Sequence, residues 1–201
     1  MPRLPDRRQA LALLAASAVL PPGHAQAPAF GLAQLMQVLG RVKSGEATFT
    51  ELRHSSLLDR PVESSGRLTF QAPDRFVRET LKPRSESLAV IGNEVTMRQG
   101  SRSRTVQLDS VPEVAVVVEA VRGTLTGNRD AIERNFQAQV SGAAASWQLL
   151  LVPREEKLRL QVVQIAVVGQ QAQLREITIS MADGDYSIMK IGNATPKAGT
   201  R

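Results

Sequence analysis

Few side chains in this 201-residue sequence could carry out covalent chemistry. The chain has no cysteine, which excludes thiol nucleophiles and thiolate metal sites. His54 is the only histidine after residue 27, and one imidazole without cysteines cannot build a zinc site. A secreted hydrolase could use His54, but no G-x-S-x-G segment presents a serine. We therefore interpret His54 as a surface or strand-edge residue.

Two further segments are similar to ligand-binding motifs but lack essential parts. Asp183-Gly184-Asp185 could begin a calcium loop, yet it has no further oxygen ligands and lies where a hairpin needs a turn. The segment from Gly123 to Asn128 has no lysine and is not a phosphate-binding loop. The sequence therefore predicts no catalytic residue, no metal site and no cofactor, and hence a protein that is not an enzyme.

The N-terminal segment has the features of an export signal. Three arginines lie near the start, an apolar run extends from Ala10 to Leu20, and Ala25-Gln26-Ala27 forms a small-x-small cleavage site. We predict that residues 1–27 are a cleaved signal peptide. The pair Arg7-Arg8 leaves both general secretion and twin-arginine export open.

The rest of the chain carries a scattered positive charge. Without the three arginines and one aspartate of the leader, the formal net charge falls from +6 to +4. One tryptophan and one tyrosine give no interleaving of basic and aromatic residues, so nucleic-acid binding is not expected. Arg98, Arg102 and Arg104 gather on one predicted hairpin. They could meet acidic headgroups or an acidic partner, or keep a sheet edge from pairing, which we favour.

Hydrophobic periodicity predicts a mostly β, α+β domain. An apolar stripe indicates a helix over residues 30–43, and valines at helical spacing after Ser110 indicate a second, with Ser110 and Glu113 as a capping box. Alternating segments indicate eleven antiparallel strands, over residues 47–53, 66–71, 75–81, 87–91, 94–98, 104–108, 136–140, 146–152, 158–168, 173–181 and 186–191.

The order of motifs along these elements points to a known family. Residues 66–76 read G-x-L-x-F-x-x-P-x-x-F, which predicts a strand, a corner at Pro73 and a second strand. The F-T-E strand precedes this hairpin, W-x-L-x-L-x-P at 147–153 follows the second helix, and a closing strand follows residue 185. Residues 29–192 thus resemble the LolA-like periplasmic lipoprotein carriers. That resemblance implies an incomplete antiparallel β-barrel of about 11 strands, covered by a helical lid.

The resemblance also implies a cavity that holds acyl chains between the sheet and the lid. The sheet residues expected to line it are Leu68, Phe70, Phe76, Leu88, Val90, Val95, Met97, Ile177, Ile179 and Met181. The lid residues expected to face it are Leu32, Leu35, Met36 and Leu39 of the first helix, and Val114, Val117, Val118 and Val121 of the second.

Two positions depart from the pattern of this family. Ala72 stands directly before the hairpin proline, where the well-studied carriers have an arginine that helps to hold the lid shut. Thr69 stands where a tryptophan is common. The chain is therefore interpreted as a divergent LolA-like protein, and both a lipoprotein and another lipid stay open as cargo.

The predicted function is that of a periplasmic carrier or chaperone that transfers an acylated lipoprotein or other lipid toward the outer membrane. An inner-membrane donor, an outer-membrane acceptor and a monomeric state are expected with it. The alternative is a periplasmic sensor or adaptor domain on the same scaffold, which binds a protein partner at the membrane. We assign residues 28–192 to the lipid-binding domain and residues 193–201 to a flexible tail.

Overall fold

The computed structural model of the chain describes residues 30–195. The predicted signal peptide and residues 196–201 of the predicted tail lie outside this range. Within it, no helix has the length and apolar character needed to cross a membrane.

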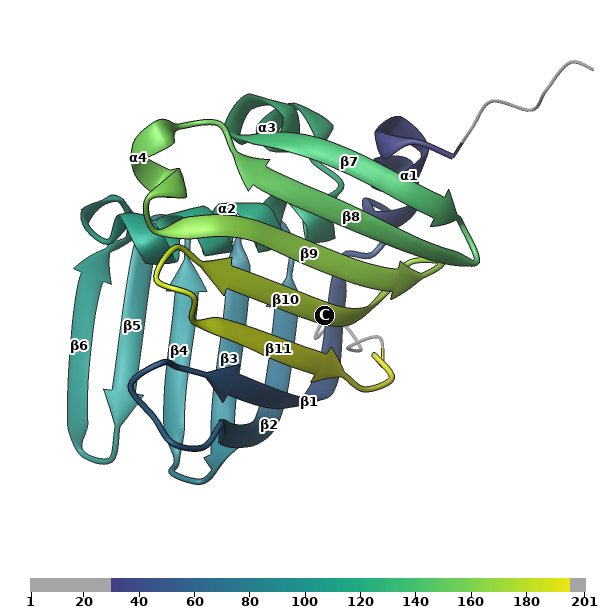
Figure 1. Cartoon of the computed structure of the whole chain (residues 1–201). Coiled ribbons are helices and arrows are strands. Elements are labelled where there is room, and N and C mark those ends of the chain that lie inside the picture. The colour runs from purple at the N-terminus through teal and green to yellow at the C-terminus, as the bar shows by residue number, and fades with distance from the viewer. Residues whose placement is uncertain (1–29, 196–201) are drawn as a thin grey trace, which may run out of the picture.

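All eleven strands belong to one antiparallel sheet (Figure 1). The strands are β1 (Ser44–His54), β2 (Val62–Gln71), β3 (Arg75–Lys82), β4 (Glu86–Ile91), β5 (Glu94–Gln99), β6 (Arg102–Gln107), β7 (Phe136–Ala143), β8 (Ser146–Pro153), β9 (Val162–Gln170), β10 (Gln173–Met181) and β11 (Tyr186–Ile191). Their order is β6-β5-β4-β3-β2-β1-β11-β10-β9-β8-β7. The edge strands β6 and β7 do not pair, so the curved sheet is an open barrel, which confirms the predicted fold class.

Side-chain alternation explains why these segments form strands with one buried face. In β8, Trp147, Leu149 and Leu151 are buried, while Gln148 between them is exposed. Hairpin turns supply the reversals: Gly92 adopts a φ of +57°, the left-handed conformation that the β4–β5 turn requires.

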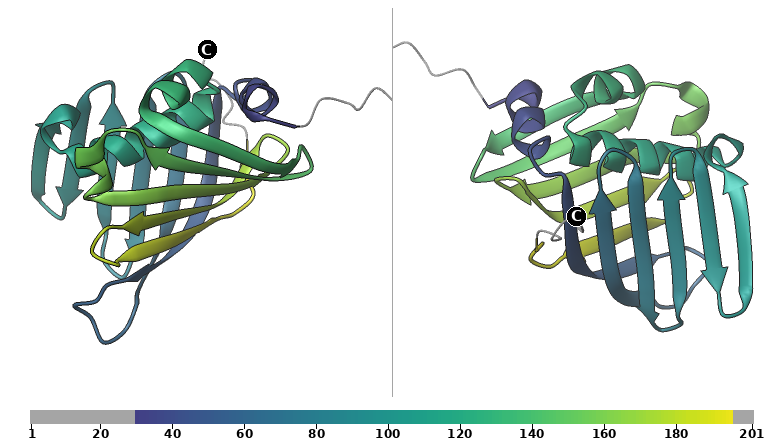
Figure 2. Two further views of the ribbon diagram at one scale, coloured as in Figure 1. Left: turned by 45° about the horizontal axis from the view of Figure 1, so that its top comes forward. Right: turned by 180° about the vertical axis from the view of Figure 1, so that it is seen from behind.

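The helices connect and cover the two halves of the sheet. They are α1 (Leu32–Leu39), the 3-10 turn η1 (Leu108–Ser110), α2 (Pro112–Thr126), α3 (Arg129–Asn135) and α4 (Glu156–Arg159). The chain leaves edge strand β6 through η1, α2 and α3 and enters the opposite edge strand β7. Figure 2 shows α2 lying between the two halves of the sheet, where it packs against side chains of both.

The predicted capping box at the start of α2 is wrong. The Ser110 hydroxyl donates to the carbonyl of Gln107 at 2.6 Å instead of accepting from the helix. Val111 is the N-cap without a side-chain cap bond, and Pro112 occupies the first turn, where a missing N–H costs nothing. The helix ends at Gly127, which caps it with a φ of +64°.

Several boundaries differ from the sequence prediction by one to four residues, and two of these differences change the description of the fold. The strand predicted to start at Leu158 starts at Val162, because residues 156–159 form α4 and the exposed Leu160 ends that helix. Pairing also extends past residue 192: Thr195 and Glu46 exchange two backbone hydrogen bonds, of 3.0 and 2.9 Å. The first residues of the predicted tail therefore extend the sheet.

The main core lies between the helices and the second half of the sheet. Trp147, Leu149 and Ile165 pack there against Leu35 of α1 and Ile132 of α3. A smaller cluster, centred on Val90, Val95 and Leu108, joins the first turns of α2 to β4 and β5. Helix α2 thus packs in both clusters, and the candidate site lies between the two clusters.

Candidate functional site

A cavity of about 640 Å³ lies between the inner face of the sheet and α2. Its walls come from β1, β2, β3, β4, β10 and β11 on the sheet side, and from α2 on the other side. Most of the lining side chains are aliphatic or aromatic. Such a wall favours an apolar ligand.

The structure places eight of the ten predicted sheet residues at this cavity: Leu68, Phe70, Phe76, Leu88, Val90, Ile177, Ile179 and Met181. The other two lie elsewhere. Val95 is 2% exposed and packs in the smaller core cluster. Met97, one pleat further along β5, lies at a second cavity described below.

The predicted lid residues divide cleanly between the two helices. The four valines of α2, Val114, Val117, Val118 and Val121, all line the cavity. The α1 residues Leu32, Leu35, Met36 and Leu39 do not. They pack in or against the main core, because the apolar face of this short helix lies against α2, α3 and β7. The cavity is therefore covered by α2, while α1 supports α2 from behind.

The valine-rich sequence of α2 has a structural explanation in its two apolar faces. Val116, Ala120 and Gly123 are buried towards the main core, and Val117 and Val121 line the cavity. A helix that is apolar on both sides must be covered on both sides. In α2, one apolar side packs against the core and the other lines the cavity.

Sequence reasoning missed the contribution of β11. Met189 and Ile191 of this strand line the cavity beside the residues of β10. Their alternation was visible, but β11 reaches the cavity wall only because it pairs with β1, and residues 49–54 are far from it in sequence. Nothing local in the sequence indicates that pairing.

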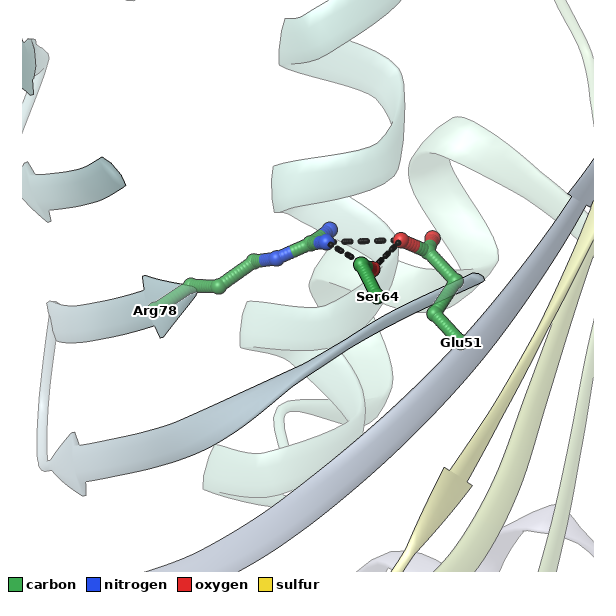
Figure 3. A network of polar contacts seen from close by, with 3 residues as sticks. All are labelled: Glu51, Ser64 and Arg78. Atoms are coloured by element: carbon green, nitrogen blue, oxygen red, sulfur yellow. Dashed lines mark hydrogen bonds and ion pairs between the residues drawn. The ribbon is translucent and has the colours of Figure 1, made fainter. Parts of the chain in front are cut away.

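A polar network interrupts the apolar wall (Figure 3). Arg78 of β3 donates from Nη2 to Glu51 Oε2 of β1 at 2.6 Å, and Ser64 of β2 lies 3.3 Å from both groups. Glu51 is only 5% exposed. The Arg78 guanidinium also lies over the ring of Phe49, 4.7 Å from its centroid. The network joins three neighbouring strands at the wall of the cavity, and it satisfies a carboxylate that is buried among apolar residues.

Breaking this ion pair is expected to destabilise the protein. Replacing one partner leaves the other charge without its counter-ion. Such losses reach 3–5 kcal/mol for a fully buried pair, and we expect about 2 kcal/mol here because the Arg78 side chain is 27% exposed. Urea unfolding of Glu51→Leu, Arg78→Leu and the double variant measures this loss in the free energy of unfolding. The double variant is expected to lose less than the sum of the two single losses.

The exposed pair Arg129–Glu133, with side chains 53% and 43% exposed, is the matched control. The same three variants at that pair are expected to change the free energy of unfolding by less than about 1 kcal/mol. Equal losses at the two pairs would contradict the role of burial at Glu51.

A polar contact also holds α2 to the sheet. Arg122 donates from Nη2 to the carbonyl of Gly92 in the β4–β5 turn, and from Nη1 to Glu119. The distances are 2.6 and 2.7 Å. This contact ties the C-terminal half of α2 to the β4–β5 turn.

The turn between β10 and β11 contributes Asp183 and Asp185 to one end of the cavity. Hydrogen bonds from the Ser55 side chain and the Ser56 backbone hold the pKa of Asp185 below its usual value. These hydrogen bonds favour the ionised form of Asp185. Their contribution to folding stability is therefore present at neutral pH and is lost as the pH falls through this lowered pKa. They tie the β10–β11 turn to the loop after β1.

A second cavity, of about 480 Å³, adjoins the first. Arg53, Arg78 and Leu88 line both. The remaining lining of the second cavity is polar and basic, with residues of β3, β4, β5 and β6. The inner face of the sheet is therefore apolar under α2 and basic beyond it.

The remaining candidate residues take structural positions. His54 stacks on Tyr186 at the end of β1, with 4.3 Å between ring centroids. Asp183 accepts a hydrogen bond from the backbone of Asp185 in a turn where Gly184 has a φ of +89°. No three side chains of the His, Cys, Asp or Glu types within residues 30–195 are placed to hold a metal ion.

A comparison with protein-family models identifies the family. Residues 24–200 match the family described as "Outer membrane lipoprotein carrier protein LolA-like". A sequence search of curated proteins returned no match. Among solved structures, a LolA superfamily protein from Nitrosomonas europaea is 9% identical, with a TM-score of 0.46 over 86% of this chain and 96% of that chain.

Two more solved structures are similar in the same range. A DUF1329 family protein from Desulfovibrio piger is 8% identical, with a TM-score of 0.49 over 85% of this chain and 92% of that chain. A putative outer membrane lipoprotein-sorting protein domain from Vibrio parahaemolyticus is 9% identical, with a TM-score of 0.47 over the same two shares. Because the family match covers most of the sequence, this chain belongs to the LolA-like outer membrane lipoprotein carrier family.

Proposed function

We propose that this protein is a periplasmic carrier that holds an acyl chain of a lipoprotein or lipid in the 640 Å³ cavity. The single observation that carries the proposal is the apolar wall shared by the sheet and α2, which leaves an unfilled volume inside an otherwise packed domain. Its size lies within the range of small-molecule sites. An apolar cavity lowers the stability of a domain, and a bound acyl chain would offset that cost.

The driving force for binding is the burial of methylene groups. Each one contributes roughly 0.8 kcal/mol when it moves from water to an apolar site. No bond is made or broken, so the protein needs no catalytic residue and no cofactor. Transfer towards the outer membrane would be completed by a donor protein at the inner membrane and an acceptor at the outer membrane, with the carrier as a monomer between them.

Ligand binding by the purified protein tests the proposal. The chain is expressed with residues 1–27, the exported protein is purified from the periplasm without detergent, and bound lipid is extracted and identified by mass spectrometry. The delipidated protein is then titrated with 1-palmitoylglycerol, which is expected to bind at one molecule per chain. Repeated preparations without lipid, together with no binding of 1-palmitoylglycerol, would contradict the proposal.

One observation supports an adaptor domain as a second candidate. The loop between β1 and β2 carries Leu57 and Leu58, which are 90% and 49% exposed. Exposed leucines in one loop suit contact with a protein partner. A stable partner that stays bound to the delipidated protein, and is lost in Leu57→Ser/Leu58→Ser, would favour the adaptor over the carrier.

A further inference from the structure

We infer that the basic second cavity is the headgroup site of the ligand, and that the ligand is an anionic amphiphile. This inference rests on the proposed function, since it places the acyl chain in the first cavity and a phosphate or carboxylate in the second. Arg53, Arg78 and Leu88 line both cavities, so one molecule can reach from one into the other.

The register of the sheet produces a change of polarity along the inner face. The row nearest α2 contains Phe76, Val90, Val95 and Val106, which are paired in sequence across four strands. The next row contains Arg78, Leu88, Met97 and Arg104. The third row contains Thr80, Glu86, Gln99 and Arg102. Over three rows the wall thus changes from fully apolar to polar and basic, which matches the two ends of an amphiphile.

The charges in the second cavity are not balanced. Five arginines line it, with Glu86 as the one carboxylate among its lining residues. Glu86 Oε1 accepts from the Gln99 amide at 2.8 Å. Within residues 30–195, Arg102 and Arg104 take part in no ion pair. Guanidinium groups in this state bind phosphate or carboxylate through charge-assisted, often paired hydrogen bonds.

Arg78 connects the two sites. Its Nη2 is held by Glu51 and Ser64, and no hydrogen bond within the described range uses its Nη1. The Glu51 contact therefore orients the guanidinium at the boundary between the apolar and the basic cavity. An anion in the second cavity would lie between Arg78 at the boundary and Arg102 and Arg104 on β6.

Two lipids that differ only in a phosphate test the inference. The delipidated full mature chain is titrated with 1-palmitoyl lysophosphatidic acid and with 1-palmitoylglycerol, both below their micelle-forming concentrations. We expect the phosphate to raise the affinity about 10-fold at low salt, and the gain to shrink at high salt. Arg102→Gln/Arg104→Gln is expected to remove this gain and to leave the affinity for 1-palmitoylglycerol unchanged.

The matched control is Arg67→Gln/Arg75→Gln. It removes the same charge from exposed positions that alternate with Leu68 and Phe76 and so lie on the outer face of the sheet. This variant is expected to retain the gain. If both double variants lose the gain in affinity equally, the gain depends on the net charge of the protein, and the headgroup site is overturned.

Glycerol 3-phosphate separates a lipid headgroup from a free phosphate. If the basic cavity takes a headgroup, glycerol 3-phosphate is expected to compete only weakly, because it lacks the acyl chain. Competition as strong as that of the lipid would overturn the inference in favour of a separate anion site. Equal binding of the two lipids would also overturn it but leave the carrier function intact, whereas binding of neither would overturn both.

Discussion

Filling the cavity from both walls is expected to abolish acyl binding. In Val121→Trp/Ile179→Trp, one indole projects from α2 and one from β10 into the space that the acyl chain would occupy. If the indoles exclude four methylenes, about 3 kcal/mol of binding free energy is lost, which weakens binding more than 100-fold. Titration with 1-palmitoylglycerol measures this loss.

The control for this variant places the same residue outside the cavity. Leu160→Trp/Val163→Trp changes side chains that are 74% and 46% exposed and do not line either cavity. It is expected to bind the lipid as the unchanged protein does. Urea unfolding of both variants shows that each is folded. A cavity-filled variant that folds and still binds the lipid normally would place the acyl site elsewhere.

Replacing Gly66 is expected to cause a large loss of stability. A Cβ at this position would lie 1.8 Å from the backbone oxygen of Glu79, and 3.0 Å from the ring of Phe49. A backbone atom cannot move aside as a side chain can, so Gly66→Ala must shift β3 against β2. We expect the free energy of unfolding to fall by about 3 kcal/mol, as measured by urea unfolding.

Gly45→Ala is the control for the backbone entropy that alanine removes from the unfolded chain. Gly45 is also a strand residue, and a Cβ there would lie an ordinary 3.7 Å from the backbone oxygen of Thr195. The free energy of unfolding of Gly45→Ala is expected to differ from that of the unchanged protein by less than about 1 kcal/mol. Similar losses in Gly45→Ala and Gly66→Ala would show that the close approach to Glu79 is not the cause.

The strands and the sheet side of the cavity were predictable because alternation is a local property. Once Leu68 and Phe70 are assigned to a strand, they share a face whatever that strand pairs with. The same reasoning placed Ile177, Ile179 and Met181 together, and all five residues line the cavity. It failed for Val95 because membership of a face does not say how far along the strand the cavity extends.

The position of α1 was not predictable from its sequence. Its apolar stripe shows that one face is covered, but Leu35 and Leu39 are covered by the core and not by a ligand. The distinction depends on where α3 and β7 lie, and residues 129–143 are distant in sequence. The Glu51–Arg78 pair was missed for the same reason, since its partners are 27 residues apart and meet only through the register of β1, β2 and β3.

The motif residues around the first hairpin have separate physical reasons. Gly66 is required by the close approach of the Glu79 backbone at a bulge between β2 and β3. Phe70 and Phe76 line the cavity, where their rings stack with 5.2 Å between the centroids. A single sequence shows such residues side by side without saying which of them are needed for close backbone packing and which line a cavity.

The two apolar faces of α2 limit how the proposed acyl cargo could enter the cavity. Val116 and Ala120 belong to the main core, so swinging α2 outward as a flap would unpack the domain. Its two ends also continue, through η1 and α3, into the unpaired edge strands β6 and β7. If the cavity holds an acyl chain as proposed, that chain would therefore enter through movement of the strands that wall the cavity, while α2 stays in place.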